Sequence, residues 1–108
     1  MLDKSPSDRM KRKVLIENLW FFILQLVKKN PRYGNELKKL ISEKFGFLVG
    51  NVTSYKVLYD LESEGYLKVD GDYRKKYTIT EKGIKELKKA TTFLKDLIEG
   101  KRVLYKKH

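Results

Sequence analysis

The segment NVTSYKVLYDLESEGYLKVDGDYRKKYTITEKG, residues 51–83, decides the fold. Asn51 can cap an amphipathic helix, and Gly65 is the residue type favoured just past a helix C-terminus. The stretches YLKVD and KYTIT then alternate large and polar residues as strands do, and Gly71 and Asp72 between them are turn formers. The segment therefore predicts a helix, a glycine stop and a β-hairpin that carries a basic patch.

Two helices are predicted before this segment. One runs from Gly34 to Phe45, with its apolar residues spaced along a single face. The other begins at a cap on Ser7 or Asp8 and continues to Val27. From residue 14 onward this first helix is apolar nearly all round, which is more than one domain face can bury. A partner subunit is therefore expected to cover part of it.

A last helix is predicted after the hairpin, with Thr80 as its N-cap and Glu81 in its first turn. Its apolar positions are spaced by three and four residues in turn, as in the seam of a coiled coil. A seam on a terminal helix predicts a partner helix. The expected dimer contacts are Leu19, Trp20, Ile84, Leu87, Thr91, Leu94 and Ile98.

The predicted order of elements is typical of a winged helix-turn-helix, in which the second helix of the pair enters the major groove and the hairpin lies along the backbone. The expected class is α+β but mostly α, with a two-stranded wing and long terminal helices that form a dimer. We expect a flexible basic tail (1–8), a DNA-binding domain (9–80) and a C-terminal dimerisation helix with a basic tail (81–108).

Charge supports a polyanionic partner. The 108 residues carry 25 Lys and Arg against 14 Asp and Glu, a formal net charge of +11. Such an excess attracts nucleic acid, whose counterions are released on contact. The same composition also occurs in thermophile proteins, where surface charge serves stability. The arrangement of the charges therefore has to decide between nucleic-acid binding and a role in stability.

Several other classes are disfavoured. The chain has no cysteine, and its one histidine is the terminal His108, so neither a metal site, a cofactor nor an enzyme is predicted. The most apolar run, Leu19 to Val27, is about half as long as a membrane span. We expect a cytoplasmic protein.

Three stretches carry a resemblance to a known family: YGNEL (33–37), TSYKVLYDLESEGYL (53–67) and RKKYTITEKG (74–83). They resemble PadR-like winged-helix transcriptional regulators over roughly residues 24–97. The resemblance implies a dimer paired through its C-terminal helix, a recognition helix at 52–64 and a wing at 67–79. Two residues depart from the family pattern, because Lys56 replaces a common proline and Asp60 places a negative charge on the outward face.

These features predict a sequence-specific regulator of transcription, most simply a repressor, bound to a pseudo-palindromic duplex as a homodimer. The predicted DNA contacts are Thr53, Ser54, Lys56 and Val57 on the recognition helix, Arg74, Lys75 and Lys76 on the wing, and, on weaker grounds, Arg32, Tyr33, Asn35, Lys11 and Arg12. The alternatives are a non-specific DNA-compacting protein and a winged-helix module for protein interaction.

Aromatic residues are expected to serve packing. The tyrosines at 55, 59, 66, 73 and 77 are predicted to lie in or beside the core, with base stacking as the alternative. Trp20, Phe21 and Phe22 are predicted to pack between helices, with a small-molecule effector pocket as the alternative.

Overall fold

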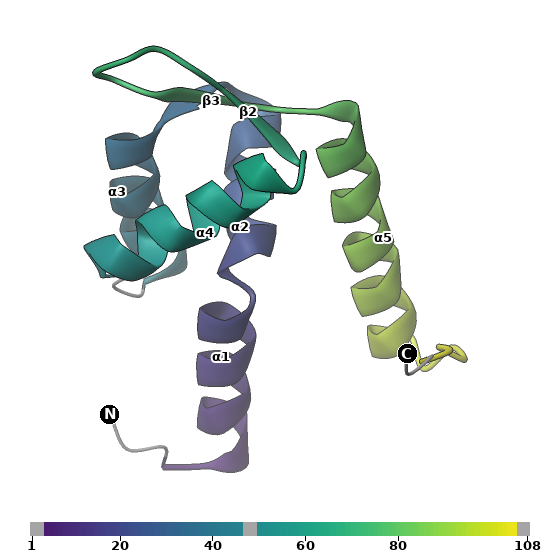
Figure 1. Ribbon diagram of the computed structural model, residues 1–108. Coiled ribbons are helices and arrows are strands. Elements are labelled where there is room, and N and C mark those ends of the chain that lie inside the picture. Colours follow the sequence, from purple (N-terminus) through teal and green to yellow (C-terminus); the bar gives the residue numbers. More distant parts are fainter. Residues whose placement is uncertain (1–3, 47–49, 106–108) are drawn as a thin grey trace.

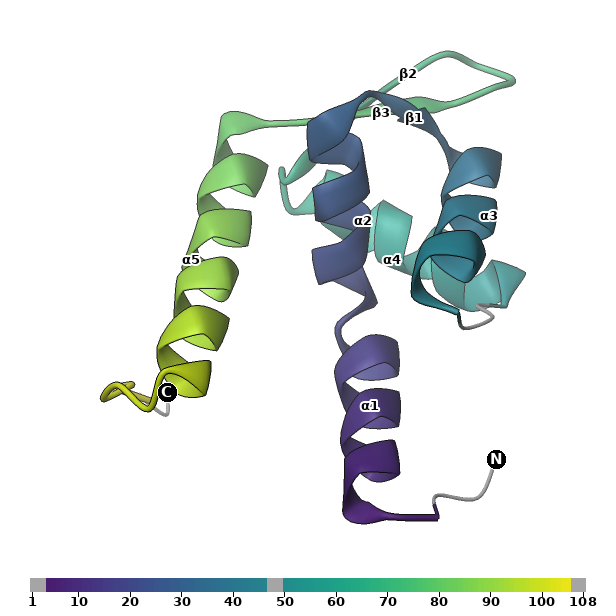
Figure 2. The same ribbon diagram turned by 180° about the vertical axis from the view of Figure 1, so that it is seen from behind.

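The computed structural model describes residues 4–46 and 50–105, which form five helices and three short strands (Figures 1 and 2). In chain order these are α1 (Pro6–Glu17), α2 (Leu19–Lys29), β1 (Arg32–Tyr33), α3 (Gly34–Phe45), α4 (Asn51–Ser63), β2 (Leu67–Asp70), β3 (Lys76–Ile79) and α5 (Glu81–Ile98). The mostly helical winged helix-turn-helix class is confirmed.

The first predicted helix is in fact two helices. The backbone leaves the helical region at Asn18, where φ is −123° and ψ is 36°, and the Asn18 side-chain amide donates to the Val14 carbonyl oxygen. The prediction of one continuous helix is therefore wrong. The predicted cap is wrong too, because the Ser5 hydroxyl accepts from the backbone N–H of Asp8 at 3.2 Å and the helix begins at Pro6. An Asn side chain can form hydrogen bonds with the backbone that compete with those of the helix. The prediction gave more weight to the apolar residues on both sides of Asn18 than to this tendency.

The core is centred on α2. Its buried residues pack against Leu37 and Ile41 of α3, and the rings of Phe22 and Phe45 lie 4.5 Å apart. The remaining core residues come from α4, both wing strands and the first half of α5: Leu58, Leu61, Leu67, Tyr77 and Leu87. Helix α1, by contrast, has no buried residue.

The sheet has three strands rather than two, in the order β1-β3-β2, with both pairs antiparallel. Residues Arg32 and Tyr33 pair with Tyr77 and Lys76, so the chain just before α3 is tied to the wing. The two-stranded prediction missed β1 because a two-residue strand is too short to show any alternation. The register of β2 on β3 runs from Leu67 opposite Ile79 to Asp70 opposite Lys76.

The end of α4 is confirmed and its start is corrected. Gly50, not Asn51, is the N-cap, whereas Gly65 takes the left-handed conformation (φ 85°) expected after a helix end. Thr80 is confirmed as the N-cap of α5, because its hydroxyl accepts from the Gly83 backbone N–H and also donates to the Gly65 carbonyl at 2.6 Å. A Cβ at Gly83 would collide with the Tyr66 carbonyl, so only glycine allows this close approach.

Helices α1 and α5 diverge from the body of the domain, and both project on the side away from the wing (Figures 1 and 2). The first half of α5 packs on α2 through Leu87, but its second half is exposed. Gly100 (φ 72°) follows the helix end, and residues 101–105 have no regular structure. No helix in the part of the chain that the structure describes is long and apolar enough to cross a membrane.

Candidate nucleic-acid interface

The exposed face of α4 includes two of the four predicted recognition residues. Thr53 and Lys56 are exposed, Val57 is half-buried beside the core, and Ser54 is only 2% exposed. The placement of Ser54 on the outward face is therefore wrong. Ser54 shares its face with Leu58 and Leu61, because positions i, i+4 and i+7 lie on one side of a helix.

The tyrosines of α4 take the outward positions instead. Tyr55 and Tyr59 are 52% and 67% exposed, and Tyr73 at the wing tip is fully exposed, so their predicted packing in the core is wrong. The prediction holds for Tyr77, which is buried, and for the half-buried Tyr66. Burial raises the pKa of Tyr77. Three phenol rings, two on α4 and one at the wing tip, thus face solvent.

Lys56 is engaged within its own helix. Its ammonium group lies 2.9 Å from the Asp60 carboxylate, one turn further along α4. Both side chains are largely exposed, so the pair contributes little to stability. It nevertheless engages the one basic side chain of α4, so a base or a phosphate would compete with Asp60 for Lys56.

A second lysine joins helices α3 and α4. The Lys38 ammonium group donates to the Asn51 side-chain oxygen at 2.7 Å. Asn51, predicted as the N-cap of α4, therefore connects the two helices of the helix-turn-helix instead.

The wing holds its basic residues in a defined place. The Arg74 guanidinium lies over the Tyr33 ring, 3.7 Å from the ring centre, and the Lys76 ammonium group is 5.6 Å from the same centre. A cation over an aromatic face is attracted by the ring quadrupole. Gly71 makes the turn possible, since its φ is 96° and a Cβ there would lie 2.6 Å from the Arg74 carbonyl oxygen.

These contacts build a notch between the wing and the start of α3, which we call the α3–wing notch. It has a volume of about 360 Å³ and is lined by Gly34, Asn35, Tyr55, Tyr73, Arg74 and Lys75. The Gly34 backbone N–H donates to the Lys75 carbonyl oxygen, which joins the wing to the helix start. A helix N-terminus favours anions, and here it combines with two cationic side chains. The notch suits a phosphate group of a duplex.

The notch unites residues that were predicted separately. Asn35, Tyr33 and the wing residues come together, and Tyr33 supports Arg74 rather than standing alone. Arg32 is different, because its Nε donates to the Leu26 carbonyl oxygen at 3.2 Å and so completes the end of α2. Lys11 and Arg12 lie on α1, at the opposite end of the molecule from the wing (Figure 1).

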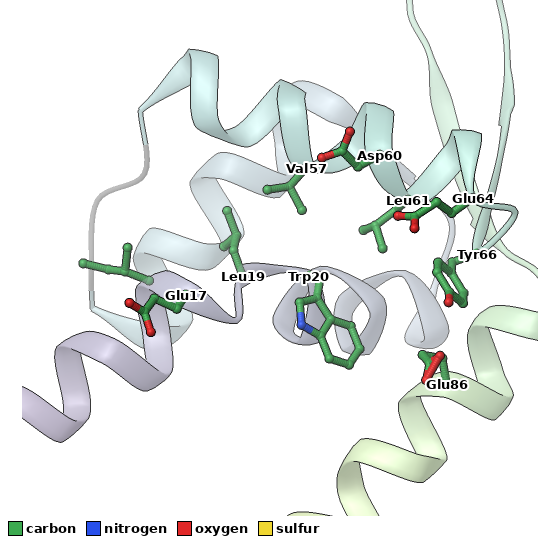
Figure 3. A pocket seen from close by; sticks show the side chains of 10 residues that line it. Glu17, Leu19, Trp20, Val57, Asp60, Leu61, Glu64, Tyr66 and Glu86 are labelled. Atoms are coloured by element: carbon green, nitrogen blue, oxygen red, sulfur yellow. The ribbon is translucent and has the colours of Figure 1, made fainter. Parts of the chain in front are cut away.

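The other side of α4 faces an acidic pocket of about 350 Å³ (Figure 3). Trp20, Val57 and Leu61 form its apolar part, while the carboxylates come from Glu17, Asp60, Glu64 and Glu86. Tyr66 and Glu86 lie next to each other at one end, and the Glu86 charge raises the pKa of the Tyr66 hydroxyl. Trp20, expected to pack between helices, is half-buried against the core and also lines this pocket. Asp60 belongs both to this pocket and to the ion pair with Lys56.

Not all residues expected at a dimer interface are exposed. Leu19 and Leu87 are buried in the core of the single chain, and Ile84 and Thr91 line a cleft between α2 and α5. Ile84, Thr91, Leu94 and Ile98 are exposed in the single chain. Val14 and Ile16, in the stretch expected to be covered by a partner subunit, are also exposed. Sequence reasoning missed Met10 on α1 and Phe93 and Leu97 on α5, which are exposed as well. The sequence signal for Phe93 and Leu97 was the presence of apolar residues on more than one face of α5 beyond Ala90.

The structure also bears on metal binding. Among residues 4–46 and 50–105, no group of three or more His, Cys, Asp or Glu side chains could hold a metal ion. The terminal His108 lies outside the described residues.

Comparison with known proteins identifies relatives. Residues 23–89 match the model of the transcriptional regulator PadR-like family. Curated protein sequences yield no match.

Several solved structures share the fold. A transcriptional regulator from Clostridium thermocellum has 29% identity and a TM-score of 0.70, covering 85% of this chain and 99% of that chain. A PadR-like transcription factor from Bacteroides fragilis has 26% identity and a TM-score of 0.73, with coverages of 85% and 94%. Bacillus subtilis PadR, in complex with operator DNA, has 25% identity and a TM-score of 0.59, with coverages of 68% and 46%.

Proposed function

This chain belongs to the PadR-like family of transcriptional regulators, and we propose that it is a repressor that binds a pseudo-palindromic operator as a homodimer. The structure of B. subtilis PadR in complex with operator DNA supports the choice of duplex DNA as the partner. The proposal assigns no catalytic step to the chain, and it places its action in the cytoplasm, where an operator is accessible.

The observation that carries the proposal is the α3–wing notch beside the exposed face of α4. Arg74 and Lys75 converge with the N-terminus of α3 at one concave place, and Tyr33 holds Arg74 there. Contacts of this kind position a protein on the phosphate backbone, whereas base edges are recognised from the major groove. Thr53 and Lys56 on α4 are the candidates for base recognition, together with the exposed ring of Tyr55.

The apolar surface on α1 and α5 supports the homodimer. Phe93, Leu94, Leu97 and Ile98 are all exposed in the single chain, and a contiguous apolar patch of this kind marks an interaction site. Pairing through these helices would set two copies of α4 about a two-fold axis. Recognition helices in such dimers enter successive major grooves about 34 Å apart, so bound protein would block polymerase.

Fluorescence anisotropy tests the function directly. The full chain is titrated into the duplex upstream of its own gene and into a scrambled duplex, at low and at near-physiological salt. We expect the native duplex to keep a preference of roughly a thousandfold as salt rises. Equal weakening of both duplexes would instead support non-specific compaction, the alternative that the net charge of +11 favours.

Sedimentation tests the dimer. We expect a dimer at micromolar concentration, and Leu97→Glu should convert it to a monomer because a charge would enter the apolar surface. A wild-type monomer, or a half-site bound as tightly as the full site, would contradict the proposal.

A further inference from the structure

A second cleft, on the far side of α2 from the acidic pocket, has the opposite charge. It has a volume of about 820 Å³ and is lined by Gln25, Lys28, Lys29, Lys44, Ile84, Leu87, Lys88 and Thr91. Four of these residues are lysines, from α2, α3 and α5, and none of the lining residues is acidic. Seen from behind, α2 lies between α3 and α5 (Figure 2), so the lysines converge from three elements.

Like charges gathered in this way oppose one another. Lys29 and Lys44 are one such pair, since a hydrogen bond to Lys29 and the positive charge of Lys29 lower the pKa of Lys44. Elsewhere lysines have carboxylate neighbours one turn away: Lys39 lies 3.9 Å from Glu43, and Lys85 lies 3.9 Å from Glu81. An anion in the cleft would supply the negative charge that its own lining lacks.

The number and chemistry of the lining groups indicate the kind of anion. Four ammonium groups carry up to twelve N–H donors on flexible stems, which suit several phosphate oxygens better than one carboxylate. The Gln25 amide adds a polar group, while the side chains of Ile84 and Leu87 form an apolar wall. We propose that the α2–α5 cleft binds a small polyphosphate, either inorganic or carried by a nucleotide whose base lies against Ile84.

Such a ligand would have a structural consequence. Lys28 and Lys29 belong to the body of the domain, and Lys88 belongs to α5, so a bound polyphosphate would join α5 to the body. In the proposed dimer, α5 would set the spacing of the two recognition helices. A ligand that fixes α5 would therefore affect operator binding, and this effect rests on the proposed function. Binding itself does not depend on DNA and is measured without it.

Calorimetry on the full chain tests the site at near-physiological ionic strength, with inorganic tripolyphosphate and with ATP in separate titrations. The variant Lys44→Ala/Lys88→Ala removes two cleft lysines, and Lys39→Ala/Lys95→Ala removes two lysines from the same helices outside the cleft. The two variants have equal net charge. We expect the cleft variant to bind about a hundredfold more weakly, since each charge-assisted hydrogen bond contributes about tenfold, and the control to bind as wild type.

The outcomes separate clearly. Equal losses in both variants, or no binding by wild type at millimolar ligand, would overturn the proposal. Equal affinity for tripolyphosphate and ATP would identify the phosphates as the whole ligand, and tighter binding of ATP would identify a nucleotide.

Thermal unfolding without ligand provides a second test. Lys44→Ala should raise the melting temperature at low salt, because it removes a repulsive neighbour of Lys29, while it weakens ligand binding. A solvated surface lysine would change neither quantity, and that result would overturn the proposal.

Discussion

Helix α4 and the wing hold their basic side chains in opposite ways. On the wing, Arg74 is held over Tyr33 and lines the notch. On α4, Lys56 is paired with Asp60, whose carboxylate competes with any base or phosphate for the ammonium group. We infer that the two elements serve different purposes. A preorganised charge on the wing raises the affinity for any duplex, whereas a lysine that exchanges Asp60 for a new acceptor favours only duplexes that present a suitable acceptor.

The largest effect is expected from the variant Arg74→Ala/Lys75→Ala, which removes both cationic side chains from the notch. We expect operator and random DNA to bind about a hundredfold more weakly, because both side chains are proposed to bind phosphates. The slope of log affinity against log salt should fall by about 1.8, or about 0.9 for each phosphate that the protein no longer neutralises. The matched control Lys85→Ala/Lys89→Ala, on α5, removes the same charge. A weakening confined to the operator would show that the wing recognises bases.

Lys56→Ala tests the other region. Its expected effect is a loss of about 1–3 kcal/mol on the operator and little change on random DNA, since the side chain is assigned to base recognition. Anisotropy titrations with both duplexes give the two numbers. An equal loss on both would assign Lys56 to the backbone and remove the distinction between α4 and the wing.

Tyr33 decides whether the wing charge is preorganised. Tyr33→Leu removes the ring under Arg74 and should cost about 1 kcal/mol of affinity for either duplex, whereas Tyr33→Phe keeps the ring face and should bind as wild type. The pair of variants distinguishes the ring from the hydroxyl. If Tyr33→Phe also weakens binding, the hydroxyl itself contacts DNA.

Asp60→Asn gives the smallest expected effect and the opposite sign. It frees Lys56 and removes a negative charge from α4, so affinity for both duplexes should rise by about 0.2–1 kcal/mol. Glu62→Gln, on the same helix, changes the net charge equally but leaves the ion pair intact. The preference for the operator should fall with Asp60→Asn only, since a free lysine no longer discriminates between acceptors.

Much of the fold was predictable because its signals are local. The glycine after α4, the threonine that caps α5 and the turn at Gly71 depend on the conformational preferences of single residues. The wing charges Arg74 and Lys75 were found for the same reason, since they adjoin a turn that the sequence marks. The break at Asn18 was missed because the apolar residues on both sides of it suggested one continuous helix.

The tertiary structure decided which side chains of each helix face the core and which face solvent. Whether Ser54 or Tyr55 points inward depends on the side from which α3 and the wing approach α4, and the periodicity of a short helix with residues of mixed polarity fits both choices. The division of α5 into a half that packs on α2 and a half that is exposed has the same origin.

By itself, therefore, the sequence determined the order from α3 to α5, several helix ends and the charge of the wing, because these follow from neighbours within a few residues. Only the tertiary structure placed Tyr33 under Arg74, paired β1 with β3 and closed the notch. Those contacts join residues about forty positions apart, and their geometry follows from how the helices pack rather than from any local preference.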